Sequence, residues 1–272
     1  MTLLRVEHLT VEIGANRVVD DVSFAVDRGQ RLGIIGESGS GKTLSALSIV
    51  GLEPDGARVS GSVVFDGVEL RGRSDRELAA IRGERIAMVF QNPLRALNPV
   101  MRVGRQISEP LRIHNGLGRS DAAAAALEWC RRVALPDPER TVNAYPHQLS
   151  GGQRQRVGIA IALACGPALL IADEPTTALD VTVQADVLAL LDTLIAEQGT
   201  ALVFITHDIA LVSEVARSIV VMREGRIVEH GATDDLVRHP RHEYTAELVA
   251  AARRTSWGDA PVDGVPVDEV PA

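Results

Sequence analysis

Gly36-Glu37-Ser38-Gly39-Ser40-Gly41-Lys42-Thr43 is the stretch that decides the fold, because it fits the phosphate-loop pattern G-x-x-x-x-G-K-[ST]. It lies between an apolar strand expected at Arg31 to Ile35 and a helix expected at Lys42 to Gly51, which is the context this motif requires. The glycines let successive N–H groups point at phosphate oxygens, and the helix adds the positive end of its dipole. We expect Lys42 to reach the β- and γ-phosphates of a nucleotide and Thr43 to ligate Mg²⁺. A flexible Gly/Ser loop is the alternative.

The composition supports this role for Lys42. The 28 basic residues are 27 arginines and Lys42 alone. A surface position tolerates either residue, but a compact ammonium held among phosphate oxygens cannot be replaced by a larger, planar guanidinium. The single lysine therefore points to a position where the chemistry requires it.

Length and charge exclude several classes of protein. The 272 residues, of which 46% are hydrophobic, can bury a sizeable core. The net charge of −8 and the lack of a basic run argue against nucleic-acid binding. The longest apolar stretch, Val157 to Ala172, is too short to span a membrane, and Met1 to Val11 does not resemble a signal peptide, so we expect the protein in the cytosol. Cys130 and Cys165 are expected to be buried, inert thiols.

Strands alternating with helices predict an α/β fold with a mostly parallel sheet. A hairpin with strands at Val6–Ile13 and Val18–Val26 precedes the loop. Further strands are expected at 59–65, 86–90, 168–172, 201–206 and 218–222. Residues 1–91 and 165–235 then form the nucleotide-binding core, and residues 92–164 form an inserted helical subdomain. Residues 236–256 form a short C-terminal extension, and residues 257–272 are expected to be a disordered tail.

A second motif, Leu149-Ser150-Gly151-Gly152-Gln153, identifies the family. Ser150 and Gln153 form an S-x-x-Q capping box for a helix at Gln153–Ala164, and glycines in a first helical turn suggest that something approaches the backbone closely. With the phosphate loop, this stretch resembles the signature sequence of ABC transporter ATPase subunits, over about Leu3 to Arg254. The resemblance implies a RecA-like P-loop NTPase core. It also implies a dimer in which Ser150, Gly151, Gly152 and Gln153 meet the γ-phosphate bound by the other subunit.

The same resemblance assigns roles to five further residues. Asp173 and Glu174 end an apolar strand, as in the Walker B motif, where Asp173 holds Mg²⁺ and Glu174 orients the attacking water. Gln91 stands where the Q-loop glutamine contacts Mg²⁺ and water. Asp180, in Ala178-Leu179-Asp180, fits the D-loop at the dimer seam, and His207 fits the switch histidine that bonds the γ-phosphate.

The adenine position departs from the family pattern. An aromatic residue usually precedes the first hairpin glycine and stacks on the base, whereas this chain has Ile13 before Gly14. An aliphatic side chain packs against a base without offering a π-face. We therefore expect ATP to bind with weaker recognition of the base.

Three stretches resemble the oligopeptide/dipeptide permease ATPases, a group that includes nickel importers. The first, after the Q-loop, comprises Asn92-Pro93, Leu97-Asn98-Pro99 and Val103 to Ile107. The second is Leu179 to Ala185, and the third is Pro240 to Thr245 with Leu248, in which Glu243 replaces a proline. Some members carry an iron–sulfur cluster in a cysteine-bearing extension, and no cysteine follows Cys165, so no cluster is expected.

The resemblance implies an importer motor on the cytoplasmic face of the membrane, with peptides as the leading cargo. Its partners would be a second ATPase subunit, identical or related, membrane permeases and an external solute-binding protein. Nickel or metal-chelate import and an exporter remain alternatives. A soluble ABC ATPase is the alternative outside transport. Ribosome-associated members usually carry two cassettes, and DNA-repair members a long coiled coil, whereas only 106 residues without sustained heptads separate Lys42 from Leu149 here. A P-loop kinase would lack the signature.

Overall fold

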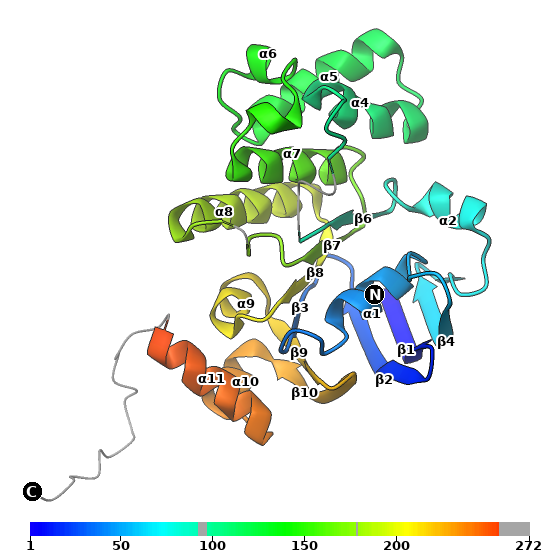
Figure 1. The fold of residues 1–272 in the computed structure, drawn as a ribbon, viewed down its shortest axis with the longest axis vertical. Coiled ribbons are helices and arrows are strands. Elements are labelled where there is room, and N and C mark those ends of the chain that lie inside the picture. Colours follow the sequence, from blue (N-terminus) through cyan, green and yellow to red (C-terminus); the bar gives the residue numbers. More distant parts are fainter. Residues whose placement is uncertain (92–96, 178, 256–272) are drawn as a thin grey trace, which may run out of the picture.

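The structure is a computed structural model that describes residues 1–91, 97–177 and 179–255 (Figure 1). Within these ranges the strands form an antiparallel sheet in the order β2-β1-β4-β5 and a second, mostly parallel sheet in the order β10-β9-β3-β8-β7-β6. The strands are β1 (Thr2–Ile13), β2 (Asn16–Asp27), β3 (Arg31–Ile35), β4 (Ala57–Phe65), β5 (Val68–Glu69), β6 (Ile86–Val89), β7 (Leu169–Asp173), β8 (Ala201–Thr206), β9 (Ser218–Arg223) and β10 (Arg226–Ala232).

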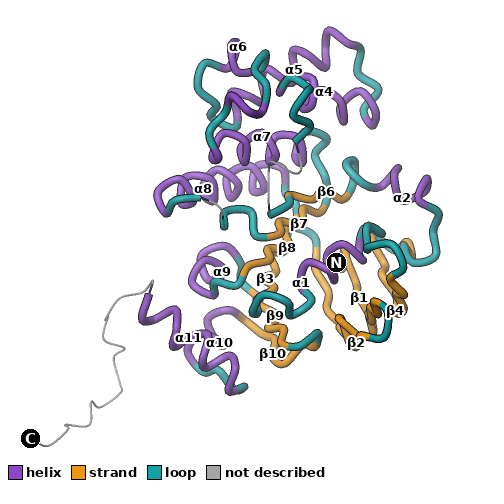
Figure 2. Tube along the Cα trace, viewed as in Figure 1, coloured by secondary structure: helices purple, strands orange, loops and turns teal. Residues whose placement is uncertain are grey.

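The helices cover this second sheet and extend beyond one end of it (Figure 2). They are α1 (Lys42–Ile49), α2 (Asp75–Ile81), α4 (Val103–His114), α5 (Arg119–Arg132), α6 (Pro138–Thr141), the short helix η1 (Pro146–Gln148), α7 (Gly151–Leu163), α8 (Val181–Gln198), α9 (Ile209–Val215), α10 (Thr233–Arg238) and α11 (Glu243–Thr255). The run from α4 to α7 lies between β6 and β7 in the chain, where a helical insertion is expected.

The antiparallel sheet follows from alternating side chains. In β1, Leu4, Val6, Leu9 and Val11 are buried, while most residues between them are at least partly exposed. The hairpin turn is Gly14-Ala15. Strand β1 begins four residues before its predicted start, and β2 is longer than predicted at both ends. This sheet forms one hydrophobic cluster with α1 and one face of the parallel sheet.

The parallel strands are apolar on both faces, as strands covered on both sides must be. β7 and β8 are buried along their whole length, and β3 and β8 have the bounds predicted from the sequence. β10, which pairs antiparallel with β9 at the edge of this sheet, was not predicted. The predicted α/β fold class is confirmed.

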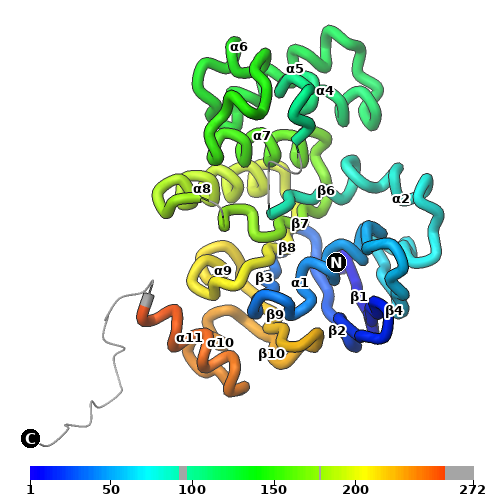
Figure 3. Tube along the Cα trace, in the orientation of Figure 1, coloured from blue at the N-terminus to red at the C-terminus, as the bar shows by residue number. Residues whose placement is uncertain are grey.

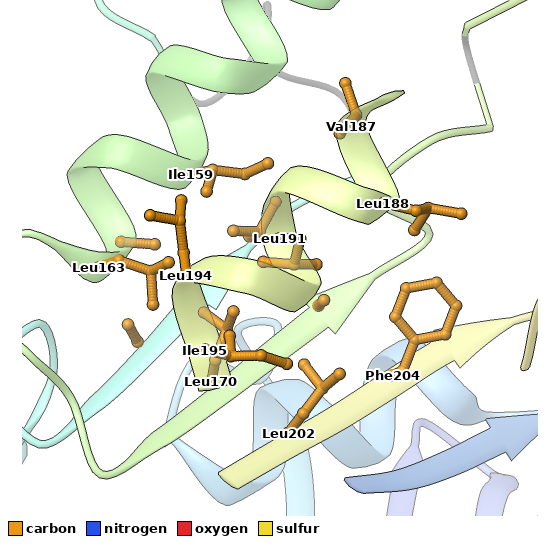
Figure 4. Packing of buried hydrophobic residues seen from close by; sticks show 14 of the residues in the cluster. Ile159, Leu163, Leu170, Val187, Leu188, Leu191, Leu194, Ile195, Leu202 and Phe204 are labelled. Atoms are coloured by element: carbon orange, nitrogen blue, oxygen red, sulfur yellow. The ribbon is translucent and has the colours of Figure 1, made fainter. Parts of the chain in front are cut away.

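Helix α8 joins the helical region to the sheet. Its side chains Leu191, Leu194 and Ile195 lie between α7 and the strands β7 and β8, as Figure 4 shows. The apolar stretch Val157 to Ala172 covers the C-terminal half of α7 and most of β7, and both contribute side chains to this cluster. In the described part of the chain, none of the helices has both the length and the apolarity that a membrane crossing requires.

The sequence analysis expected both thiols to be buried, and the structure confirms this for Cys130 only. Cys130 is fully buried and Cys165 partly buried, and burial raises the pKa of each thiol to about 11. Neither is therefore a nucleophile at neutral pH. Three expectations fall outside the described residues: the Asn92-Pro93 match, Ala178 of the D-loop, and the disordered tail at 257–272.

Candidate active site

Four neighbouring parallel strands deliver the predicted catalytic residues to one edge of the sheet. In the order β3, β8, β7, β6, these strands are followed by the phosphate loop, by His207, by Glu174 and by Gln91. Asp173 is the last residue of β7. Ligands of open α/β sheets bind at the carboxyl ends of the strands, so this edge is the candidate site.

The phosphate loop curls around the amine of Lys42. The lysine Nζ donates to the carbonyl oxygens of Gly36 (2.8 Å) and Glu37 (2.7 Å), and it lies 3.4 Å from Ser40 Oγ. Figure 3 shows the loop between β3 and α1 passing beside β9. The fit is tight there, because a Cβ on Gly36 would lie 2.1 Å from the carbonyl oxygen of Met222. A glycine is therefore required at the start of the loop.

Lys42 is only 5% exposed, an unusual place for a charged side chain. Burial lowers the pKa of its ammonium, and the carboxylates of Glu174, Asp173 and Glu37 act in the opposite direction. Its hydrogen bonds all go to atoms of the loop itself. Loop and lysine thus form one folded unit in which a positive charge is held at the carboxyl edge of the sheet.

Thr43 and Asp173 lie together beside this charge. The Thr43 hydroxyl donates to Asp173 Oδ1 at 3.1 Å, across 130 positions of sequence. Burial raises the pKa of Asp173, with Glu174 acting in the same direction and with the Thr43 hydrogen bond and Lys42 opposing it. A hydroxyl and a buried carboxylate are the oxygen ligands that Mg²⁺ accepts when phosphates and waters complete its shell. Residues 1–91, 97–177 and 179–255 contain no cluster of three or more His, Cys, Asp or Glu side chains that could hold a metal by themselves.

The carboxylate of Glu174 is the centre of a polar cluster. Gln91 Nε2 donates to Oε2 at 2.7 Å, Thr177 Oγ1 donates to the same oxygen at 3.0 Å, and His207 Nδ1 lies 3.2 Å from Oε1. The side chain is 13% exposed, so it is accessible but held in one orientation. The structure thus brings together Gln91, Glu174 and His207, the three residues to which the sequence analysis assigns catalytic roles, and adds Thr177, which it missed. The catalytic roles themselves stay predictions.

The backbone of Glu174 is also constrained. Its φ of 44° lies in the left-handed region, which residues with a side chain seldom adopt. Its N–H donates to the carbonyl oxygen of Ile205 in the adjacent strand β8, at 2.8 Å. Unusual backbone conformations of this kind concentrate at functional sites, where the surrounding structure maintains them.

The signature residues open α7 as a capping box. The Ser150 side chain accepts the N–H of Gln153, and the Gln153 side chain accepts the N–H of Ser150. The helix begins at Gly151, two residues before the predicted start. A Cβ on Gly152 would lie 2.5 Å from the Val183 side chain of α8, so this glycine is already required by packing within the chain.

The signature lies away from the phosphate loop of its own chain. The neighbours of α7 are α4, α5, α8 and β6, and Figure 1 shows α7 well apart from α1 along the long axis. Asp180 caps the adjacent helix α8 by accepting the N–H of Val183 at 3.0 Å. The role of Asp180 at a dimer seam and the approach of a second subunit to Ser150 both stay predictions.

Two residues lie at the margin of the site: Ile13, which the sequence analysis assigned to the adenine base, and Tyr244, to which it assigned no role. Ile13 ends β1 and is 39% exposed, so its side chain is free to meet a base, although nothing in the chain fixes that role. Tyr244, quoted in the sequence analysis only as part of the stretch Pro240 to Thr245, lies in α11 and accepts the N–H of Glu37 at 2.7 Å. This contact with the phosphate loop was not predicted.

Comparisons with known proteins agree with this arrangement. The family described as "ABC transporter" matches residues 19–177. The probable peptide ABC transporter ATP-binding protein y4tR of Sinorhizobium fredii is 50% identical over 244 residues, which are 89% of this chain and 73% of that protein. The dipeptide transport ATP-binding protein DppD of Escherichia coli is 46% identical over 256 residues, 92% of this chain and 78% of that protein. A dimeric ATP-binding cassette, solved in a post-hydrolysis state with ADP and phosphate, is 30% identical with a TM-score of 0.75, covering 85% of this chain and 99% of that one.

Proposed function

Because this chain belongs to the ABC transporter family and is an ATP-hydrolysing subunit, we propose that it powers the import of peptides. The observation that carries the choice of cargo is the likeness to y4tR and DppD, whose names specify peptide and dipeptide transport and which match about nine-tenths of the chain at 46–50% identity. The stretches from Leu97 to Ile107 and from Leu179 to Ala185 are the ones in which the sequence alone resembles this group.

The proposed roles follow from the positions of the side chains. The backbone N–H groups of Gly36 to Thr43 and the ammonium of Lys42 bind the phosphates of ATP. Glu174 orients and polarises the attacking water. Gln91 and His207 hold the Glu174 carboxylate between them in this structure, and we assign them the further tasks of contacting the water and the γ-phosphate.

Thr43 and Asp173 would hold Mg²⁺, with Gln91 nearby as the third group assigned to the ion. When bound, Mg²⁺ neutralises negative charge on the phosphate oxygens. The residues present fit this ion, because a hydroxyl and one buried carboxylate leave the remaining positions to phosphate oxygens and water.

The active unit we propose is a dimer at the cytoplasmic face of a membrane. Ser150 and the amino end of α7 would close over ATP held by the partner subunit, where the helix dipole and free N–H groups favour a phosphate. Permease subunits would carry the peptide across the membrane, and an external solute-binding protein would deliver it. The dimeric state of the similar cassette supports this arrangement.

Reconstitution tests the cargo. The chain is co-purified with the permeases and solute-binding protein encoded beside its gene, placed in ATP-loaded liposomes and supplied with labelled di- to pentapeptides. We expect ATP-dependent peptide accumulation that the Glu174→Gln variant abolishes. Accumulation of a nickel chelate without peptide uptake, or outward movement of cargo, would refute peptide import while leaving the ATPase assignment in place.

Ile13 predicts weak discrimination between purine nucleotides. Stacking of a base on an aromatic ring contributes about 1–3 kcal/mol, which an aliphatic side chain does not supply in full. We expect similar kcat/KM for ATP and GTP in the natural protein, and a rise of about fivefold or more in kcat/KM for ATP in Ile13→Tyr. Steady-state kinetics with both nucleotides measure this. A strong ATP preference that tyrosine leaves unchanged would place the adenine contact elsewhere.

A further inference from the structure

Tyr244 connects the C-terminal helix to the phosphate loop. It is the second residue of α11, is 1% exposed, and its hydroxyl oxygen accepts the N–H of Glu37 at 2.7 Å. The two residues are 207 positions apart in the sequence. A side chain from a distant element thus supplies the hydrogen-bond acceptor for a backbone N–H of the phosphate loop.

The N–H that Tyr244 accepts belongs to the peptide group that also holds Lys42. The carbonyl of Gly36 and the N–H of Glu37 are the two polar ends of one planar unit, and they point in opposite directions. The carbonyl end accepts Lys42 Nζ at 2.8 Å, and the next carbonyl, of Glu37, accepts it at 2.7 Å. Fixing the N–H end therefore fixes the orientation of the plane whose other end binds the ammonium.

Tyr244 is itself held from several sides. The carboxylate of Glu229, on β10, accepts the N–H groups of Arg241 and His242, each at 3.0 Å. Burial acts to raise the pKa of Glu229, but the hydrogen bonds from these two N–H groups act to lower it, and the pKa lies below its usual value. The guanidinium of Arg223 lies 4.9 Å from the centre of the Tyr244 ring. The segment that carries the tyrosine is thus tied to the edge of the parallel sheet.

We propose that Tyr244 is a positioning residue for the phosphate loop. Its hydroxyl sets the peptide plane between Gly36 and Glu37, and thereby the place of the Lys42 ammonium. The C-terminal helix α11 is then part of the nucleotide site, although it contributes no phosphate ligand. This inference rests on the proposed role of the loop in binding ATP.

The first test uses the fact that the chain has a single lysine. Protein labelled with carbon-13 at the lysine ε position gives one resonance, that of Lys42, without any need for activity or nucleotide. Tyr244→Phe removes one oxygen and should shift this resonance. The chain has one other tyrosine, Tyr145 in the helical region, and Tyr145→Phe should leave the resonance in place.

The second test measures nucleotide affinity. Loss of this partly buried hydrogen bond at the loop should weaken MgATP binding and raise KM for ATP about threefold to tenfold, with a smaller change in kcat. Tyr145→Phe should leave both constants unchanged. Glu229→Ala removes the acceptor that holds the segment before Tyr244, without changing the chemical structure of Tyr244 or of the loop. It should also weaken MgATP binding, and it replaces Tyr244→Phe in this test if that variant does not fold.

The outcomes separate positioning from packing. A folded Tyr244→Phe protein with a lowered melting temperature, but with the natural Lys42 resonance and natural affinity for MgATP, would overturn the proposal. If the natural protein failed to bind MgATP, the proposed function would fail instead. The resonance of Lys42 would still report whether Tyr244 positions the lysine.

Discussion

Glu174→Gln should reduce ATP turnover by about 10²- to 10⁴-fold while MgATP still binds. Glutamine keeps the shape of the side chain, and its amide can retain part of the hydrogen bonding with Gln91, Thr177 and His207. It cannot act as a base toward water. Phosphate binding depends on the loop and Lys42, which the substitution does not touch. The variant should therefore accumulate as an ATP-bound dimer, detected by gel filtration in MgATP.

The matched control is Glu84→Gln, which neutralises an exposed carboxylate in the turn before β6. It should hydrolyse ATP at the natural rate. The assignment of Glu174 as the base would be wrong if Glu174→Gln retained more than about a tenth of that rate, since a general base contributes far more than tenfold.

The parts of the site that the sequence predicted are those encoded in local patterns. The phosphate loop, the acidic end of β7 and the histidine after β8 each follow a short apolar strand, and the carboxyl ends of parallel strands share one edge. The Ser150 capping box is likewise local, with its two partners three residues apart, and it is confirmed. The resemblance to peptide-permease ATPases, first drawn from Leu97 to Ile107 and Leu179 to Ala185, is confirmed by the relatives.

The contacts that the sequence could not show join distant segments. Nothing near Tyr244 indicates that its hydroxyl reaches Glu37, since only the folded sheet brings β9, β10 and α11 beside the loop. The neighbour of Gly152 also could not be identified from the sequence. The sequence suggested a close approach to this backbone, but the Val183 side chain that makes one belongs to a neighbouring helix of the same chain.

Helix α2 and strand β10 are among the elements that the sequence analysis did not predict, and a local signal existed for one of these two. Helix α2 begins with a capping box between Ser74 and Glu77, the same S-x-x-E/Q signature that was recognised at Ser150. Strand β10 gives a weaker signal, because it lies at the sheet edge and most of its residues are only partly buried. Edge strands do not need the continuous apolar run that identifies a central parallel strand.

Lys42→Arg should abolish ATP hydrolysis although it preserves the charge. The ammonium sits among the oxygens of Gly36, Glu37 and Ser40, at 2.7 to 3.4 Å, and is 5% exposed. A guanidinium is planar and larger, so it cannot occupy this place without opening the loop. Since each preorganised donor to a reacting oxyanion contributes about 10²–10³ in rate, we expect kcat to fall at least about 100-fold, with weaker MgATP binding. A phosphate-release assay and nucleotide titration measure both.

Chemical modification tests the same residue without changing the sequence. An amine-acylating ester has two targets in this chain, the exposed α-amino group of Met1 and the buried amine of Lys42. Acylation of Lys42, followed by peptide mass mapping, should remove activity with one-site stoichiometry, and saturating MgATP should protect it. Arg76→Lys supplies the control, because it adds a lysine at an exposed position of α2 whose acylation MgATP should not affect. If Lys42 reacted equally with and without MgATP, or if fully acylated protein still hydrolysed ATP, Lys42 would not be the phosphate ligand.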